Sequence, residues 1–377
     1  MTWTPRPAGR TSRPAEVELE GFFDACAREH ERTAASVGEV ERLLRFGDRR
    51  LRLRFAGELL AEALTAALRP RICEGDEGPA EATIGLWEET SVPGGAAAVP
   101  WRQADVGPRG LVSGGEDAAV RVVHEAGSLA VTMFDARKRS LLHRVPGVSG
   151  LPWWERAAPL RPALFWALSG PERHLVHAGV VGDEQRGGVL LAGAGGSGKT
   201  TVALAALAAG MAYVGDDYVL LHTEGGPVAW NLFGTAKLDR GHIERFPELA
   251  AELAISADPV PDEKAVLDVD RVMGGALASS LPIRAVLVPR IRGGCARLRE
   301  ASPGEALLAL APSTAFQMPF DGGEVMRSLA GVVRALPAFA LDVGDDPAEL
   351  AEAVDRVLEQ AGSEGPARDR VAQGAGR

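Results

Sequence analysis

Residues 187–221 read GGVLLAGAGGSGKTTVALAALAAGMAYVGDDYVLL, and this stretch decides the fold of the second half of the chain. The apolar run at residues 189–191 predicts a buried strand, and residues 202–207 predict a helix. Between them, GAGGSGKT at residues 193–200 fits G-x-x-x-x-G-K-[ST], the loop that binds phosphate in strand–loop–helix units. Both flanks that the motif requires are present, so we predict a nucleotide-binding loop.

Each residue type in this loop has a physical role. Glycines let the backbone adopt positive φ and bring amide N–H groups close to an anion at a helix N-terminus. Only four of the 41 Lys and Arg residues are lysines, so a lysine in this motif position is informative. The alternative is a flexible glycine-rich turn before an ordinary helix. The residues expected to contact nucleotide are Gly193, Gly195, Gly196, Ser197, Gly198, Lys199, Thr200 and Thr201.

An acidic pair follows the strand expected after that helix. Asp216 and Asp217 come directly after Gly215, where phosphate-loop enzymes place a carboxylate that holds Mg²⁺. Two neighbouring carboxylates allow one to hold the metal while the other accepts a proton from an attacking hydroxyl. Because side chains alternate along a strand, both face one site only if the strand ends or bends at Gly215. The alternative is a polar turn, where Asp-Asp is common.

Three further side chains are candidates for the same site. His177 lies on a strand expected at residues 174–181; its sequence context favours a packing role, and the alternative is that it orients an aspartate. Lys237 and Arg240 are candidates to neutralise a transferred phosphate, with ordinary surface charge as an equal alternative. A helix is expected just after them, at residues 242–253.

Composition limits the classes of function. A net charge of −10 and a pI near 5.4 argue against a nucleic-acid-binding surface. No apolar run approaches the roughly 20 residues that span a bilayer, and the polar, proline-rich start has no signal-peptide core. Cys26, Cys73 and Cys295 lie far apart without metal-ligand spacing, so we expect reduced thiols and a cytoplasmic protein. The sequence leaves the oligomeric state open, a homo-oligomer included.

A chain of 377 residues is long enough for two domains, and the breaker cluster PGVSGLP at residues 146–152 is the expected boundary. We expect a disordered tail at 1–17, an α+β domain at 18–150, a nucleotide-binding α/β domain at 151–361 and a second disordered tail at 362–377. In the first domain, helical patterns cover residues 19–44 and 57–68, and strand patterns cover 49–55, 82–87, 120–124 and 129–135. In the second, helices are expected at 153–168, 306–310, 323–336 and 347–360, and strands at 228–233, 265–268, 283–287 and 339–343.

With these pieces in order, the chain resembles the C-terminal domain of HPr serine kinase/phosphorylase and the wider group of HPr-kinase-like proteins. The resemblance rests on HAGVV at residues 177–181, the loop and its strand at 187–200, and GMAYVGDD at 210–217. It is specific over about forty residues, continues diffusely to about residue 345 and does not cover residues 1–150. It implies an α/β P-loop kinase core with a mixed sheet, of the type shared with phosphoenolpyruvate carboxykinase, and ATP and Mg²⁺ as cofactors.

The resemblance also implies a role for each site residue. Asp216 would be the general base for a serine hydroxyl, with His177 supporting it. Lys199 would bind the β- and γ-phosphates, and Asp217 and Thr200 would hold Mg²⁺.

Two departures separate the chain from the bifunctional enzymes of that family. Those enzymes continue Lys-Ser-Glu where this chain has Lys199-Thr200-Thr201, and their Gly- and Asn-rich segment with an arginine has no counterpart here. We therefore expect neither phosphorylase activity nor HPr as the acceptor. The chain looks more like divergent relatives in lasso-peptide gene clusters, some of which phosphorylate a serine of the precursor peptide.

The expected function is a Mg·ATP-dependent kinase that acts on a hydroxyl of a peptide or protein. Two alternatives stay open at this point. One is a small-molecule kinase in which the first domain shapes a metabolite pocket, and the other is a non-catalytic ATP-binding regulatory or scaffold protein.

Overall fold

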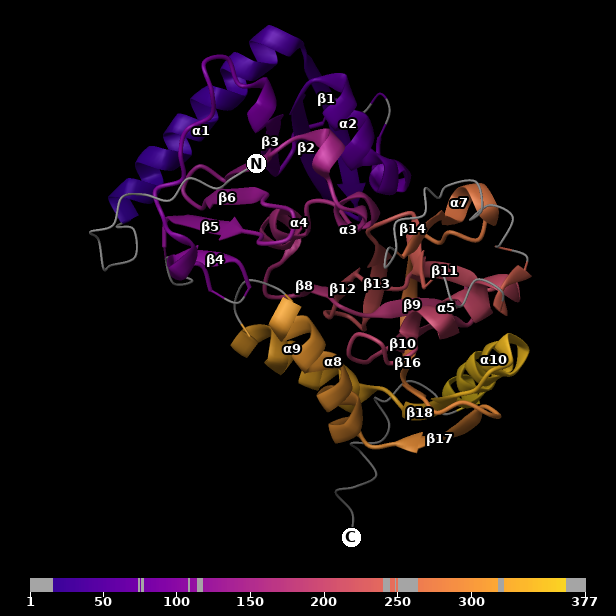
Figure 1. The fold of residues 1–377 in the computed structure, drawn as a ribbon. Coiled ribbons are helices and arrows are strands. Elements are labelled where there is room, and N and C mark those ends of the chain that lie inside the picture. The colour runs from indigo at the N-terminus through magenta and orange to yellow at the C-terminus, as the bar shows by residue number, and fades with distance from the viewer. Residues whose placement is uncertain are drawn as a thin grey trace. The chain divides into compact units, whose positions relative to one another are not determined.

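The structure is a computed structural model that describes residues 16–73, 75, 78–107, 109–113, 118–239, 245–247, 249, 264–317 and 322–363. The chain divides into two compact units (Figure 1). The first consists of Met1–Ser169 and Phe316–Asp321, and the second of Gly170–Ala315 and Gly322–Arg377. Arg240, most of the helix expected at 242–253 and nearly all of the two expected tails lie outside the described residues. None of the described helices is long and apolar enough to cross a membrane.

The first unit is built on a seven-stranded mixed sheet with the order β1-β2-β3-β7-β6-β5-β4. The pairs β2/β3 and β3/β7 are parallel, and the remaining pairs are antiparallel. The strands are β1 (Glu39–Phe46), β2 (Arg49–Ala56), β3 (Ala82–Glu88), β4 (Leu111–Ser113), β5 (Val120–His124), β6 (Val131–Asp135) and β7 (Ser140–Val145). The helices are α1 (Glu16–Val37), α2 (Glu58–Thr65), α3 (Trp153–Ala157) and α4 (Arg161–Leu168).

Helices cover both faces of this sheet. The apolar stripe of α1 packs on one face in a buried cluster that includes Met133 of β6. Because side chains alternate along a strand, the neighbouring Phe134 points to the other face, where it stacks on Trp166 of α4 with ring centroids 5.9 Å apart. Helix α4 therefore belongs to the first unit, and the boundary expected at 146–152 lies instead after Ser169.

The helical pattern over residues 19–44 is correct only as far as Val37. Gly38 has a φ of +92°, a left-handed conformation that suits glycine after the end of a helix. The following residues form β1, which pairs antiparallel with β2. The pattern was misleading because the adjacent Leu43 and Leu44 are both buried, which fits a helical repeat as well as a strand.

The second unit is built on a nine-stranded sheet with the path β11-β9-β10-β16-β13-β12-β8, to which β18 adds beside β16 and β17 beside β18. The pairs β10/β16 and β16/β18 are parallel and the others antiparallel, so the expected mixed sheet is confirmed. The strands are β8 (Arg173–Val176), β9 (Gly179–Asp183), β10 (Gly187–Leu191), β11 (Ala212–Gly215), β12 (Val219–His222), β13 (Val228–Asn231), β16 (Ser280–Ile291), β17 (Arg297–Ala301) and β18 (Ala338–Val343). A separate two-stranded ribbon consists of β14 (Thr235–Leu238) and β15 (Ala265–Asp268).

Strand β10, which precedes the glycine-rich loop, lies inside the nine-stranded sheet between β9 and β16. Val189 and Leu191 face one buried cluster, which also contains residues of α5 (Lys199–Ala208) and α10 (Pro347–Ser363). Leu190 faces the opposite cluster, which contains residues of α8 (Pro303–Gln317) and α9 (Gly322–Ala335). Helices therefore cover both faces of the sheet, and the short α7 (Val269–Val272) follows β15 (Figure 1).

Candidate active site

The loop between β10 and α5 has a backbone conformation that its glycines permit. Gly196 and Gly198 have φ values of +77° and +105°, which side-chain-bearing residues rarely adopt. A Cβ at Gly193 would lie 2.3 Å from the Ser197 hydroxyl oxygen, so this position also requires glycine. The tip at residues 194–196 is exposed, and α5 starts directly after it. The positive end of α5 and the loop backbone are thus accessible to an anion.

The side chain of Lys199 folds back over this loop. The residue is only 6% exposed, and its Nζ donates to the carbonyl oxygens of Gly193 (2.7 Å) and Ala194 (3.2 Å). Burial lowers the pKa of Lys199, while the nearby charges of Asp217 and Asp216 raise it. The loop lysine and the acidic pair therefore belong to one site.

Asp216 faces the start of α5. Strand β11 ends at Gly215, so the side chains of Asp216 and Asp217 do not have to point to opposite faces of the sheet. Both carboxylates can therefore face one site, as the sequence required. The Tyr213 hydroxyl donates to Asp216 Oδ1 (2.9 Å), and the Thr200 side chain also hydrogen-bonds to this carboxylate. Burial and the charge of Asp217 raise the pKa of Asp216, and the charge of Lys237 and these two hydrogen bonds counteract them only in part.

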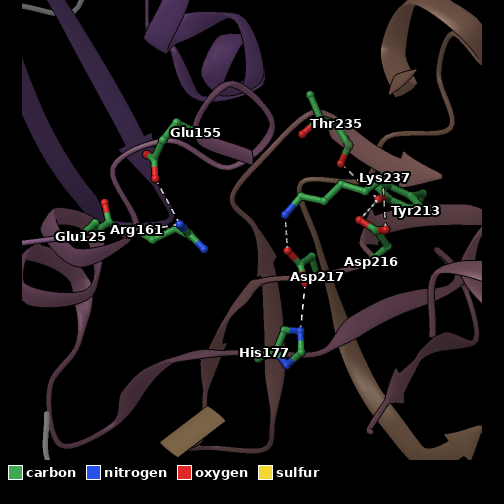
Figure 2. Close-up of polar contacts among 9 residues, drawn as sticks. All are labelled: Glu125, Glu155, Arg161, His177, Tyr213, Asp216, Asp217, Thr235 and Lys237. Atoms are coloured by element: carbon green, nitrogen blue, oxygen red, sulfur yellow. Dashed lines mark hydrogen bonds and ion pairs between the residues drawn. The ribbon is translucent and has the colours of Figure 1, made fainter. Parts of the chain in front are cut away.

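Asp217 has different partners. Its Oδ1 lies 2.9 Å from Nε2 of His177, and its Oδ2 forms an ion pair with Nζ of Lys237 (Figure 2). Burial alone would raise the pKa of Asp217, but the Lys237 charge and the His177 hydrogen bond outweigh it and hold the pKa well below its usual range. Its side chain is 24% exposed, so a ligand can reach it. The two adjacent carboxylates thus have pKa values shifted in opposite directions.

His177 lies between two strands and not within one. The strand expected at residues 174–181 is divided into β8, which pairs with β12, and β9, which pairs with β10 and β11. The backbone N–H of His177 donates to the Thr314 hydroxyl (3.2 Å), and burial lowers the pKa of its imidazole, which is therefore neutral near pH 7. The expected support of Asp216 by His177 is not what the structure shows, because the ring binds Asp217.

Sequence reasoning underestimated Lys237 and missed two tyrosines. Lys237 was expected to precede a helix, but it lies on β14 and its side chain is only 12% exposed, so it is not a surface charge. Tyr213 bonds to Asp216, and the Tyr218 ring lies 5.3 Å from the His177 ring. They are the chain's two tyrosines, and both flank the acidic pair in sequence, which was an available signal. Thr201 is buried in the first turn of α5.

A second group of metal-ligand residue types lies at the other end of β8 and β12. Glu172, His222 and Glu224 bring three potential ligand atoms within 4.8 Å of one another. Both glutamates are exposed, and exposed acidic groups of this kind are common without a metal. We assign no ion to this group.

The first unit contains its own pair of carboxylates, one buried and one half-buried, around a single arginine. Arg161 of α4 lies between Glu125 (3.3 Å) and Glu155 (3.1 Å), and the Glu155 side chain is 1% exposed (Figure 2). Burial, together with the charge of Glu155, raises the pKa of Glu125 to about 8, against the opposing charge of Arg161. One guanidinium balances one carboxylate, so the second carboxylate retains a proton in the folded chain.

Replacing Glu125 with Gln should flatten the pH dependence of stability. The folded chain keeps a proton on Glu125 that the unfolded chain loses near the ordinary pKa of 4.5, so the free energy of unfolding falls as pH rises from there to about 8. Glu125→Gln removes this titration. Urea denaturation of the full chain from pH 5 to pH 9 measures the slope, and Glu62→Gln, an exposed glutamate on α2, is the matched control. An unchanged slope in Glu125→Gln would contradict the assignment.

No family model matches this chain, and no curated protein matches it. Among solved structures, the Hpr(Ser) kinase/phosphatase from Coxiella burnetii is similar over 51% of this chain and 99% of its own, with 14% sequence identity and a TM-score of 0.30. A similarity at this level concerns the fold alone and assigns no activity to the site.

Proposed function

We propose that the second unit is the core of a Mg·ATP-dependent kinase that transfers the γ-phosphate to a hydroxyl, with a serine of a peptide or protein as the acceptor. One observation carries this proposal: the charge of Lys199, at the start of a helix behind a glycine-rich loop, interacts with two adjacent carboxylates whose pKa values are shifted in opposite directions. Two adjacent carboxylates with different partners allow one to hold a metal and the other to accept a proton. The acceptor class rests on the resemblance to HPr-kinase-like proteins.

The loop residues fit a nucleotide and a metal. The phosphates would contact the backbone amides of residues 193–198 and the ammonium of Lys199. Thr200 and Asp216 fit Mg²⁺, because their side-chain oxygens are hydrogen-bonded to one another and Mg²⁺ prefers oxygen ligands. Bound there, Mg²⁺ neutralises charge that develops on the phosphate oxygens. This assignment differs from the role that the resemblance implied, in which Asp217 held the metal.

Asp217 is the proposed general base. It is the more exposed carboxylate of the pair, and His177, donating from Nε2, orients it. The acceptor oxygen forms a bond to the γ-phosphorus, the bond from that phosphorus to the β–γ bridging oxygen breaks, and ADP takes the electron pair. The hydroxyl proton passes to the carboxylate of Asp217.

Radiolabel on the γ-phosphate of ATP tests the proposal directly. The full chain is incubated with Mg²⁺, labelled ATP and a Ser-containing peptide library, and we expect label on the peptides but not on a matched library with Ser replaced by Ala. Label found only on small metabolites would favour the small-molecule kinase. Tight ATP binding without transfer to any acceptor would favour a non-catalytic ATP-binding protein.

A further inference from the structure

Ile291 exposes an apolar side chain beside the glycine-rich loop. It is the last residue of β16, and it is 57% exposed. A Cβ placed on Gly198 would lie 3.5 Å from Ile291 Cγ1 and 3.0 Å from Val343 Cγ2, so both side chains lie against the loop where α5 begins. Val343, the last residue of β18, is buried. Of these two side chains, Ile291 is the one that presents apolar surface to solvent.

The sheet places Ile291 and the acidic pair on opposite sides of β10. In the order β11-β9-β10-β16, the strand that leads to the aspartates lies on one side of β10, and β16 with β18 lies on the other (Figure 1). Strands β10, β16 and β18 are parallel, and β11 has the same direction because it is antiparallel to β9, which is antiparallel to β10. All four strands therefore end at the same edge of the sheet, where the loop begins.

Strand β16 continues past the end of β10 and so reaches the level of the loop. Leu191, the last residue of β10, pairs with Leu287, and Ile291 follows four residues later, paired with Val343. At a rise of about 3.3 Å per residue, Ile291 lies roughly 13 Å beyond the last pair of β10. Its side chain is thus level with the loop and not with the strand before it.

The loops that follow β16 and β18 are held to each other by hydrogen bonds. The backbone N–H of Gly294 donates to Asp345 Oδ2 (2.9 Å), and the backbone N–H of Asp345 donates to the carbonyl oxygen of Gly294 (2.9 Å). Arg245 donates from Nη2 to the carbonyl oxygens of Gly344 (2.8 Å) and Asp345 (2.9 Å). The surroundings of Ile291 are therefore fixed before a ligand binds, which lowers the entropy cost of binding.

The position of this surface indicates its occupant. In the proposed reaction the γ-phosphate lies beside Asp217, and the other phosphates contact the loop backbone. The nucleoside is at the opposite end of the phosphate chain, on the side of the loop where β16 and β18 end. Ile291 offers apolar surface there, and the faces of a purine ring gain free energy by covering such surface.

We propose that Ile291 is the platform on which the purine ring of a bound nucleotide lies while its phosphates occupy the glycine-rich loop. The proposal rests on the proposed kinase function and adds the nucleoside subsite of the same site. The contact is apolar and is made to the face of the ring, so it favours purines over the smaller pyrimidines. It does not distinguish adenine from guanine, which differ at their edges.

Calorimetry of the full chain with Mg·ADP and with Mg·pyrophosphate tests the platform, because pyrophosphate has the two phosphates of ADP and no base. Ile291→Ser should lower ADP affinity by about 4- to 12-fold, the effect of leaving roughly half an isoleucine side chain uncovered, and should leave pyrophosphate affinity unchanged. Ile291→Leu keeps the apolar area and should retain ADP affinity. Leu308→Ser is the matched control, an exposed residue of α8 on the face of the sheet opposite α5.

Nuclear magnetic resonance of isoleucine methyl groups provides a readout of the base itself, because the chain has only six isoleucines. The Ile291 signal is assigned with Ile291→Leu. A purine ring that lies on the side chain moves its methyl signal upfield through the ring current, so we expect this shift with Mg·ADP and none with Mg·pyrophosphate. Ile283, which is buried on the same strand, is the internal control.

The outcomes separate the platform from the proposed function. If neither ADP nor pyrophosphate binds, the loop does not bind phosphate, and the kinase assignment fails together with the platform. If both bind, the platform alone is overturned by any of three results: an unchanged ADP affinity in Ile291→Ser, an equal loss of ADP and pyrophosphate affinity, or an Ile291 methyl signal that does not respond to ADP.

Discussion

Replacing Asp217 with Asn should lower phosphate transfer by about 10²–10⁴-fold, the usual contribution of a general base, while ADP binding persists. Asn keeps an oxygen that can accept the hydrogen bond from His177 Nε2, so the geometry around the ring is retained and the loss falls on proton acceptance. The rate of transfer from labelled ATP measures the first quantity, and titration calorimetry with Mg·ADP measures the second.

Asp216→Asn is the matched control for this experiment, since the two aspartates are adjacent but have different partners. Asp216 bonds to Thr200 and Tyr213 and is proposed to hold the metal, so its replacement should raise the Mg²⁺ concentration that activity requires. If Asp217→Asn retains full activity, and Asp216→Asn lowers transfer by about 10²–10⁴-fold without raising the Mg²⁺ concentration that the remaining activity requires, Asp217 is not the base. The roles that the resemblance implied would then hold.

Local sequence patterns were sufficient to predict the strand before the glycine-rich loop, β10, and the helix after it, α5. The short apolar run before residue 192 forms β10, and the alanine-rich run after residue 201 forms most of α5. The glycines between them favour a turn that separates the two elements. Asp216 and Asp217 follow the end of β11, as Gly215 indicated. A strand end is a local property, so the sequence can report it.

The partners within the site were not predictable in the same way. Which aspartate meets His177 depends on how the chain turns after Gly215 and on the break between β8 and β9, and neither follows from residue type. Lys237 reaches Asp217 because β14 pairs with β15, about thirty residues further along the chain, and such a pairing has no local signature. The boundary after Ser169 likewise depends on a contact between distant residues, the stack of Phe134 on Trp166.

Replacing Lys199 with Met should weaken nucleotide binding about 10- to 100-fold, since a hydrogen bond between charged groups contributes roughly 1.5–3 kcal/mol. Met matches the length of the buried stem, so the packing around the residue is kept and the ammonium alone is lost. Transfer should fall by at least about 10²–10³-fold, because charge on the phosphates increases in the transition state. Calorimetry with Mg·ATP analogue measures the affinity, and the labelled-ATP assay measures the rate.

Lys138→Met is the control for this substitution, because Lys138 pairs with Asp24 and Asp135 in the first unit. Its replacement should leave both the nucleotide affinity and the rate of transfer unchanged. The Lys199 ammonium also donates to the carbonyl oxygens of Gly193 and Ala194, so its loss leaves two loop acceptors without that donor. Thermal unfolding of the variant separates a displaced loop from a lost phosphate contact, since only the first lowers Tm. A Lys199→Met protein that unfolds at the same temperature and binds nucleotide normally would show that phosphate does not bind at this loop, and the kinase assignment would fail with it.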